Sequence, residues 1–186
     1  MKRILAALAL FVCGNATAEL PGELFAATFI GKGNMDIGSE YTLDGYDETS
    51  NYMAIGAQAG YRFASNIAVS LYFFNTLSGG TFFQITDDYR VIEEGIQIGY
   101  TFDLHKHLKI TPKIGRGYWT LKVKEGLLFS GEVIEEQEFK GNDSFWQLQV
   151  EVPFNRLFQM YLSYEQKNYE FGQAARTDLG FKFEFL

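Results

Sequence analysis

The stretch GAQAGYRFASNIAVSLYFF, residues 56–74, alternates residue by residue between two kinds of side chain. Large apolar residues such as Val69, Leu71 and Phe73 occupy one phase, whereas smaller or polar residues such as Gln58 and Arg62 occupy the other. A period of two is typical of β-strands, because successive side chains point to opposite faces of a sheet. Only Ala-Ser-Asn separates the two halves, so the stretch predicts two antiparallel strands joined by a tight turn.

The same alternation recurs along the chain and predicts eight strands of roughly 10 to 12 residues, long enough to cross a bilayer when tilted. The first strand is expected at 24–35. Short links are expected near residues 65, 105 and 155, and longer polar links at 36–51, 77–90, 125–143 and 168–175. Regular alternation of short and long links is typical of an up-and-down barrel with one plain rim and one elaborated rim.

The two faces of the predicted strands differ in both size and polarity. One face contains almost nothing but Ile, Leu, Val, Phe, Tyr and Trp, and the other is rich in Gly and carries the charges. These charged residues, expected to form a charge network in the lumen, are Arg62, Glu93, Lys109, Lys113, Glu151, Glu165, Lys167, Lys182 and Glu184. An unpaired charge facing hydrocarbon costs roughly 2 to 4 kcal/mol at the bilayer midplane.

The interior of an eight-stranded barrel is just wide enough to be filled by side chains. Stacked Phe and Ile would overfill it, so we expect Gly, Ser, Gln, Lys and Glu to fill the lumen and the apolar face to contact lipid. The predicted fold class is therefore all-β, an eight-stranded antiparallel up-and-down transmembrane β-barrel. The alternative is a soluble sheet protein, such as a sandwich whose faces alternate equally regularly.

The first 18 residues have the form of a secretory signal peptide. Lys2 and Arg3 precede an apolar run, and Ala16-Thr17-Ala18 has the small-x-small form of a cleavage site. The expected division is residues 1–18 as a cleaved signal and residues 19–186 as the barrel domain; the alternative is an N-terminal buried helix. Cleavage removes two basic residues and the only cysteine, which changes the net charge from −7 to −9. The chain has no excess of basic residues, so its composition does not indicate nucleic acid as a partner.

Pro112 lies inside the fifth predicted strand, where a closed barrel has no free edge for a residue without an N–H. Gly115-Arg116-Gly117 follows, so we expect a β-bulge at 112–117 that shifts the phase. Such a bulge would turn Trp119, Leu121 and Val123 outward. Without it, Arg116 would face lipid near the outer rim and reach toward lipid phosphates.

Catalytic and metal chemistry have little support in the sequence. The only two histidines, His105 and His107, lie at a short link, which is expected on the periplasmic side, far from the long loops. A nucleophile and its histidine base therefore cannot meet at the outer rim, as an enzyme acting on outer-leaflet lipid requires. We expect no enzyme activity and no cofactor. His-x-His could hold a metal, but two exposed rim histidines are the expected reading.

The long links are acidic. Residues 36–51 hold five acidic residues and no basic one, and 125–143 hold six acidic residues against Lys140. Two readings remain: ordinary solubilisation of surface loops, or attraction of divalent cations and basic partners. Segment 127–134, LLFSGEVI, is more apolar than a solvated loop requires. It is expected to extend the two flanking strands beyond the membrane, with an edge for strand addition to another protein.

The chain ends TDLGFKFEFL, and a final strand of Gly followed by alternating aromatics resembles the C-terminal assembly signal of outer-membrane barrels. Its residues are Gly180, Phe181, Phe183 and Phe185; the departure is Leu186, where the signal usually closes on an aromatic residue. Together with the hairpin GYRFASNIAVSLYFF, the pattern resembles the small eight-stranded outer-membrane barrels: the OmpA transmembrane domain, the OmpX/Ail proteins and the opacity-type proteins.

This resemblance implies a monomer in the cell outer membrane, in contact with outer-membrane lipid, lipopolysaccharide and the barrel-assembly machinery. The function expected from it is non-catalytic: a structural or surface-interaction role, such as adhesion or resistance, through four long extracellular loops with a possible protein partner there. The alternative is a passive channel for small or hydrophobic solutes, as in the OmpW group. A lipid A-modifying enzyme is the third hypothesis, against which the histidine positions argue.

Overall fold

The structure is a computed structural model, and it describes residues 22–43, 46, 48–78, 88–126 and 133–185. The predicted signal peptide, residues 1–18, lies outside the described residues. The elements in chain order are β1 (Gly22–Ile37), η2 (Ser39–Tyr41), β2 (Glu48–Phe63), β3 (Ile67–Ser78), β4 (Asp88–Tyr100), β5 (Phe102–His105), β6 (Leu108–Gly126), β7 (Val133–Pro153), β8 (Phe158–Tyr169) and β9 (Gly172–Phe185). No helix among the described residues is both long and apolar enough to cross a membrane.

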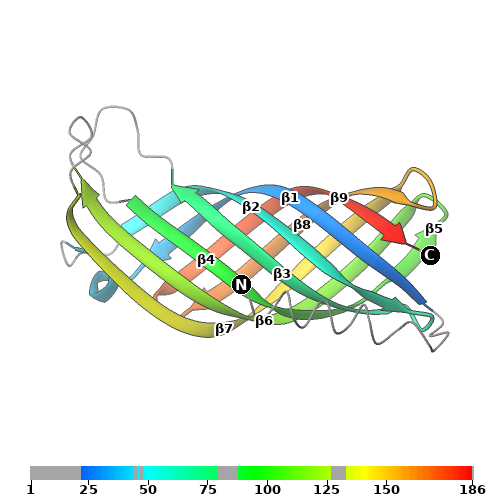
Figure 1. Cartoon of the computed structure of the whole chain (residues 1–186), viewed down its shortest axis with the longest axis horizontal. Coiled ribbons are helices and arrows are strands. Elements are labelled where there is room, and N and C mark those ends of the chain that lie inside the picture. Colours follow the sequence, from blue (N-terminus) through cyan, green and yellow to red (C-terminus); the bar gives the residue numbers. More distant parts are fainter. Residues whose placement is uncertain (1–21, 44–45, 47, 79–87, 127–132, 186) are drawn as a thin grey trace.

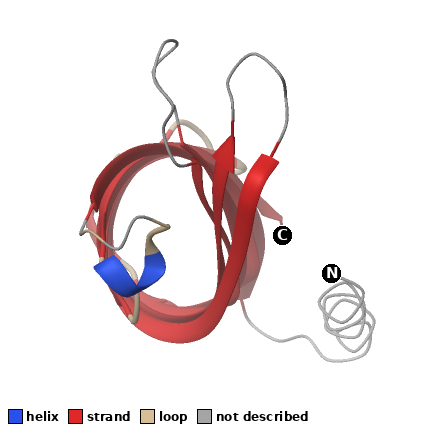
Figure 2. Ribbon diagram, turned by 90° about the vertical axis from the view of Figure 1, so that its left-hand side faces the viewer, coloured by secondary structure: helices blue, strands red, loops and turns tan. Residues whose placement is uncertain are grey.

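The strands form one closed antiparallel barrel. The sheet order is β4-β3-β2-β1-β9-β8-β7-β6-β5, and an additional pairing of β4 with β6 closes it (Figure 1). Elements β4 and β5 are two parts of one barrel strand interrupted at Thr101, so the wall has eight strands. Viewed along the axis, the strands form a ring, and the η2 turn lies within its outline (Figure 2). The predicted fold class is confirmed.

The two ends of the barrel differ. We call one the turn end: it carries the start of β1, the end of β9 and the short links β2–β3, β5–β6 and β7–β8. At the β2–β3 turn, Asn66 adopts a φ of 64°, and its N–H donates to the Phe63 carbonyl at 2.9 Å. Asn tolerates this left-handed conformation better than most residues. The opposite end, with the links 38–47, 79–87 and 127–132, is called the loop end.

The prediction of a fourth long link at 168–175 is wrong. Strand β8 continues to Tyr169 and β9 begins at Gly172, so only two residues form the turn. Gly172 has a φ of 149°, and a Cβ built on it would lie 1.8 Å from the carbonyl oxygen of Asp36. A glycine is required there because only a residue without a side chain fits against the β1 backbone.

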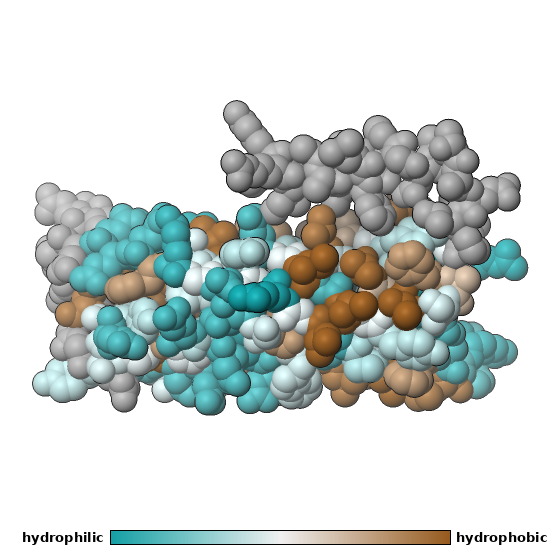
Figure 3. All heavy atoms as spheres, turned by 90° about the horizontal axis from the view of Figure 1, so that it is seen from below, coloured by the Kyte–Doolittle hydropathy of each residue, from teal (hydrophilic) through white to brown (hydrophobic). Residues whose placement is uncertain are grey.

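The outer wall is apolar toward the turn end and polar toward the loop end. Exposed Ile, Leu, Phe and Trp side chains form a belt around the barrel. We call the loop-end side of the barrel upper and the turn-end side lower; the upper members of the belt include Ile30, Phe73, Ile96, Ile114 and Trp146. Farther toward the loop end the outward positions become polar. Figure 3 shows hydrophobic side chains gathered in the right-hand half of the visible face and hydrophilic ones over the left-hand half. This division matches a barrel whose lower wall contacts lipid and whose upper wall contacts water.

The lumen is not filled by small and polar residues alone, as the sequence predicted. Its part toward the loop end is closed by a large apolar cluster, which includes Met35, Ile37, Tyr52, Phe74, Tyr89, Val91, Trp119, Leu121, Val123, Tyr169 and Phe171. Tyr41 is the last residue of η2, and Leu43 lies in the link that follows it. Both pack against this cluster from the opening of the barrel at the loop end, which we call the mouth. Aromatic side chains fit because glycines lie beneath them: a Cβ on Gly141 would lie 2.3 Å from the Trp119 ring.

The β-bulge predicted at 112–117 is also wrong. The registers of β6 with β4 and with β7 are continuous through this stretch. Pro112 is accommodated because the neighbouring strand is interrupted at the same level, between Tyr100 and Phe102. The phase therefore does not shift. Arg116 is exposed on the outer wall, whereas Trp119, Leu121 and Val123 point into the lumen with exposed fractions of 2%, 0% and 0%.

Candidate functional site

The structure places the charged residues predicted for the lumen on the inner face of the wall. Seven of them are buried: Glu93, Lys113, Glu151, Glu165, Lys167, Lys182 and Glu184. Arg62 is nearly so, with a side chain 11% exposed. Lys109 lies at the turn-end rim, where its ammonium is 3.8 Å from the carboxylate of Asp103, and it does not join the others.

Toward the turn end, four of these residues form one group of ion pairs. The Arg62 guanidinium lies 3.0 Å from Glu184 and also pairs with Glu23 at the rim. Lys182 lies 3.2 Å from Glu184 and pairs with Glu151, which accepts a further hydrogen bond from Thr111 at 2.8 Å. These contacts connect β2, β7 and β9 across the lumen.

A second group lies higher in the barrel. Glu165 is 3.3 Å from Arg176 and 3.9 Å from Lys167, and Arg176 is 2.7 Å from Asp178. Lys167 pairs with Glu93, which also accepts hydrogen bonds from the hydroxyls of Tyr72 and Tyr169. The aromatic cluster begins immediately above, so these charges lie away from water, where each needs a partner.

The lumen charges balance. Among the buried charged residues that the structure describes, with the nearly buried Arg62 included, five cations (Arg62, Lys113, Lys167, Arg176 and Lys182) face five carboxylates (Glu93, Glu151, Glu165, Asp178 and Glu184). Lys113 bonds amide oxygens instead of a carboxylate, with Gln58 at 3.2 Å and Gln149 closer. Together, the ion pairs and the aromatic cluster occupy the barrel from the turn end to the mouth, an arrangement suited to closing a lumen.

Sequence reasoning did not select Arg176 and Asp178 as members of this network. Asp178 alternates with Leu179 and Phe181, and that alternation indicated its inward direction. Arg176 lies next to the link that was predicted at 168–175, and this placement hid its phase. Of the two tyrosines on Glu93, Tyr72 lies in the inward phase between Leu71 and Phe73, whereas Tyr169 fell within the link predicted at 168–175, which hid its phase.

At the loop end β6 and β7 extend beyond β8; on the other side, β4 accompanies β6 as far as Asp88↔Lys124. The pairing of β6 with β7 runs from Lys109↔Glu151 to Gly126↔Val133, whereas β7 pairs with β8 only over 145–153. We call residues 117–126 and 133–143 the projecting hairpin. Its outward face carries a ladder of ion pairs: Lys122 is 3.1 Å from Glu138, and Lys124 is 3.1 Å from Glu136. Hydrogen bonds from Lys140 and Lys122 hold the pKa of Glu138 below its ordinary value.

Beside the hairpin, an aromatic and acidic rim surrounds the mouth. The rings of Tyr41 and Phe139 meet edge to face with centroids 4.9 Å apart. Burial raises the pKa of the Tyr41 hydroxyl, and the carboxylates of Glu170, Glu40 and Asp143 raise it further. These carboxylates therefore act together on one half-buried aromatic side chain.

The predicted assembly residues lie on the last strand. Phe181, Phe183 and Phe185 point outward and are 43%, 47% and 52% exposed, so they belong to the apolar belt. Gly180 faces inward beneath Tyr161, whose ring would meet a Cβ at 2.3 Å. Recognition of this strand by an assembly machinery remains a prediction.

His105 and His107 are exposed at the turn end, with ring centroids 5.6 Å apart. In the part of the chain that the structure describes, no group of three or more His, Cys, Asp or Glu residues is arranged to hold a metal ion. The link residues 44–45 and 47, with the acidic Asp44 and Asp47, and residues 127–132 of the apolar segment LLFSGEVI lie outside the described residues.

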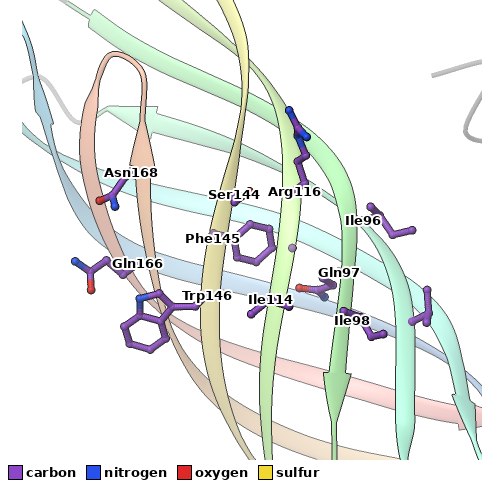
Figure 4. A pocket seen from close by; sticks show the side chains of 12 residues that line it. Ile96, Gln97, Ile98, Ile114, Arg116, Ser144, Phe145, Trp146, Gln166 and Asn168 are labelled. Atoms are coloured by element: carbon purple, nitrogen blue, oxygen red, sulfur yellow. The ribbon is translucent and has the colours of Figure 1, made fainter.

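A groove opens on the outer wall over β3, β4, β6, β7 and β8, with a volume of about 720 Å³. Figure 4 shows Ile96, Ile98, Ile114 and Trp146 along its length and Arg116 at its upper part. It lies where the apolar belt gives way to polar residues.

Comparison with known proteins agrees with this architecture. Solved structures with the same fold include Ail of Yersinia pestis (TM-score 0.62, 16% identity, 89% of this chain and 99% of that chain) and Neisserial surface protein A (TM-score 0.64, 12% identity, 87% and 97%). Another is OprG of Pseudomonas aeruginosa (TM-score 0.56, 12% identity, 90% and 98%). No curated protein sequence matches. The family model for the outer membrane protein beta-barrel domain matches residues 4–185, and the chain therefore belongs to this family of outer-membrane barrels.

Proposed function

We propose that the protein is a non-catalytic surface protein of the outer membrane that binds another polypeptide outside the cell through its projecting hairpin. The observation that carries this proposal is the length of β7: its first twelve residues lie beyond the last residue that β8 pairs with. Small outer-membrane barrels place their short turns in the periplasm and their long loops outside. The loop end, with the hairpin, would then face the exterior.

The hairpin reaches well beyond the membrane. From Arg116, at the upper limit of the apolar belt, β6 continues for ten residues to Gly126. At about 3.3 Å per residue and a tilt of about 40°, this extension rises roughly 25 Å above the lipid boundary. The ion-pair ladder on its outer face keeps the two strands together in water.

The edge of β7 facing β8 offers backbone groups for a further strand. In the described part of the chain, residues 138–144 pair with β6 on one side and with no strand on the other. An unpaired strand edge can hydrogen-bond an extended segment of another chain, which adds a strand to the sheet. The neighbouring Glu40, Asp143 and Glu170 favour a partner segment with basic residues.

Closure of the lumen supports surface binding over the alternative of a solute channel. The ion pairs and the aromatic cluster fill the space through which a solute would pass. The non-catalytic reading is supported by the histidines, which lie at the end opposite to the hairpin.

The test uses a shortened variant in which residues 118–142 are replaced by an Asn-Gly turn, which suits a two-residue β-hairpin; Gly117 and Asp143, which are cross-strand partners, then flank the turn, and most of the unpaired β7 edge is removed. Purified protein in nanodiscs is applied to an array of immobilised ten-residue peptides with Lys alternating with Val or Tyr, and with Glu-containing peptides of the same pattern. The wild type is expected to bind the Lys peptides, and the shortened barrel is not.

The matched control replaces residues 38–43 by a Gly-Ser linker and keeps the hairpin. Binding lost equally in both variants, or wild-type binding to the Glu peptides, would contradict strand addition at β7. Heat-modifiable mobility on gels verifies that each variant is a folded barrel.

A further inference from the structure

The groove on the outer wall has a lining that changes from apolar to polar along the barrel axis. Toward the turn end, Ile96, Ile98 and Ile114 are 51%, 46% and 64% exposed, and Trp146 beside them is 45% exposed. These side chains belong to the belt that contacts hydrocarbon. An apolar groove at this level fits an acyl chain, whose burial between ridges of side chains gains dispersion contacts.

Arg116 lies at the upper part of the groove, toward the loop end. Arg116 is exposed, and within the described residues it makes hydrogen bonds to the side-chain oxygen of Asn142, 2.9 Å from Nε, but no ion pair. Neighbouring lining residues are Ser144, Gln166 and Asn168, which can donate hydrogen bonds. Figure 4 shows Arg116 extending away from the isoleucines, toward the loop end.

The height of Arg116 matters as much as its charge. On β6 it is the first outward residue above Ile114, and on β7 Ser144 follows Trp146 in the same way. Beyond this level the outward residues of β6 and β7 are polar or carry a hydroxyl, as in Tyr118, Thr120 and Asn142, so we expect the headgroups of the outer leaflet to begin here. An arginine at this boundary favours phosphate, because its planar guanidinium can hydrogen-bond two oxygens at once.

We propose that this groove is a binding site for an anionic, phosphate-bearing lipid of the outer leaflet. An acyl chain lies against Ile96, Ile98, Ile114 and Trp146, and the phosphate pairs with Arg116. Asn142 positions the guanidinium from above. This site is separate from the β7 edge and does not depend on a protein partner.

Tryptophan fluorescence can test the site directly. The chain has two tryptophans, and Trp119 points into the lumen with 2% of its surface exposed, so acyl chains reach Trp146 alone. The protein is reconstituted into phosphatidylcholine vesicles with a minor fraction of phosphatidylglycerol. Bromine atoms are placed on the acyl chains of one lipid or the other, and quenching of Trp146 reports which lipid occupies the groove.

We expect wild-type protein to favour phosphatidylglycerol about fivefold, since one cation near a membrane surface contributes about that factor. The preference should fall to near unity in Arg116→Gln and be largely kept in Arg116→Lys. Inorganic phosphate should not displace the lipid, because the acyl chain contributes to binding.

The matched control is Lys32→Gln. Lys32 is an exposed cation on β1, directly above Ile30 at the same limit of the belt, and it is not among the residues of the groove. It should leave the quenching preference unchanged. Equal quenching by both lipids in the wild type would overturn the proposal, as would equal effects of the Arg116 and Lys32 substitutions.

Discussion

Lys167 and Glu93 form an ion pair whose side chains are 2% and 0% exposed, and the Lys167 ammonium lies 4.2 Å from the centre of the Phe145 ring. The pair joins β4 to β8 across the lumen, directly beneath the aromatic cluster. The pair thus connects the ion pairs of the lumen to the aromatic cluster that closes its end.

Glu93→Gln should destabilise the barrel by about 3 to 5 kcal/mol, because it removes the nearer carboxylate partner of the buried Lys167 and leaves only Glu165 at 3.9 Å, which already pairs with Arg176. Equilibrium unfolding by urea in lipid vesicles measures the loss. Asp103→Asn provides the comparison, since Asp103 pairs with Lys109 at the exposed rim and should contribute at most about 1 kcal/mol. Similar losses in the two variants would show that the lumen pair is not shielded from water.

Gly172→Ala should cost about 1 to 3 kcal/mol, because its φ of 149° and the close approach of the Asp36 carbonyl leave no room for a Cβ. Gly38→Ala is the matched substitution: a Cβ there meets its nearest atom at 3.7 Å, and the loss should be small. Urea midpoints of both variants test the difference. A neutral Gly172→Ala would mean that the β8–β9 turn has another conformation.

The ladder on the projecting hairpin should respond to acid. Since folding lowers the pKa of Glu138, its stabilising contribution is present above the unfolded-state pKa and disappears as the pH falls through the folded-state value. Hydrogen exchange of the hairpin amides should therefore be faster in Glu138→Gln than in wild type at neutral pH. At about pH 2 the two rates should converge; a difference that persists there would exclude this carboxylate as the cause.

Labelling of intact cells should show which end faces outward. A cysteine introduced at Glu170, in the β8–β9 turn, should react with a membrane-impermeant maleimide, and one at Asn155, in the β7–β8 turn, should react only after lysis. Both positions are exposed. The reverse result would place the hairpin in the periplasm and remove the basis of the proposed function.

Planar bilayers containing the purified barrel should show no steady single-channel current, because ion pairs and aromatic rings occupy the lumen. Trp119→Ala combined with Phe171→Ala removes part of the aromatic cluster, and any leak should appear first in this double variant. Steady currents through the wild type would favour the channel alternative.

The sequence predicted the barrel well where its wall contacts lipid. From Val69 to Phe73 and from Ile96 to Tyr100, outward residues are apolar and inward ones small or polar, so the period of two and the direction of each face could both be inferred. The lumen charges followed from the same rule, since a membrane barrel keeps charged side chains inside.

Above the belt the rule reverses, and prediction failed there for that reason. Lys122 and Lys124 point to water, while Leu121 and Val123 point into an apolar lumen. This part of the wall is built like a water-soluble sheet, with apolar residues inside. A reading that required apolar residues outward had to invoke a bulge at Pro112 to restore the phase.

The β8–β9 turn was missed for a different reason. Its two residues, Glu170 and Phe171, are not typical turn formers, and Phe171 instead packs against Trp119 with ring centroids 4.8 Å apart. The conformational demand falls on Gly172, one glycine among 19 in the chain. Its positive φ and the position of the Asp36 backbone distinguish it from the other glycines that the structure describes, and neither can be read from the sequence.

The ion pairs of β9 can form only when the barrel is closed in the correct register. Lys182 reaches Glu151 on β7, and Glu184 reaches Arg62 on β2, so residues of β9 meet opposite charges on strands from both sides of the seam. A sheet that stays open, or that joins two residues out of step, leaves these groups stranded in a dry interior. These ion pairs would therefore lower the free energy of the closed barrel in its native register relative to open or misregistered forms of a newly inserted chain.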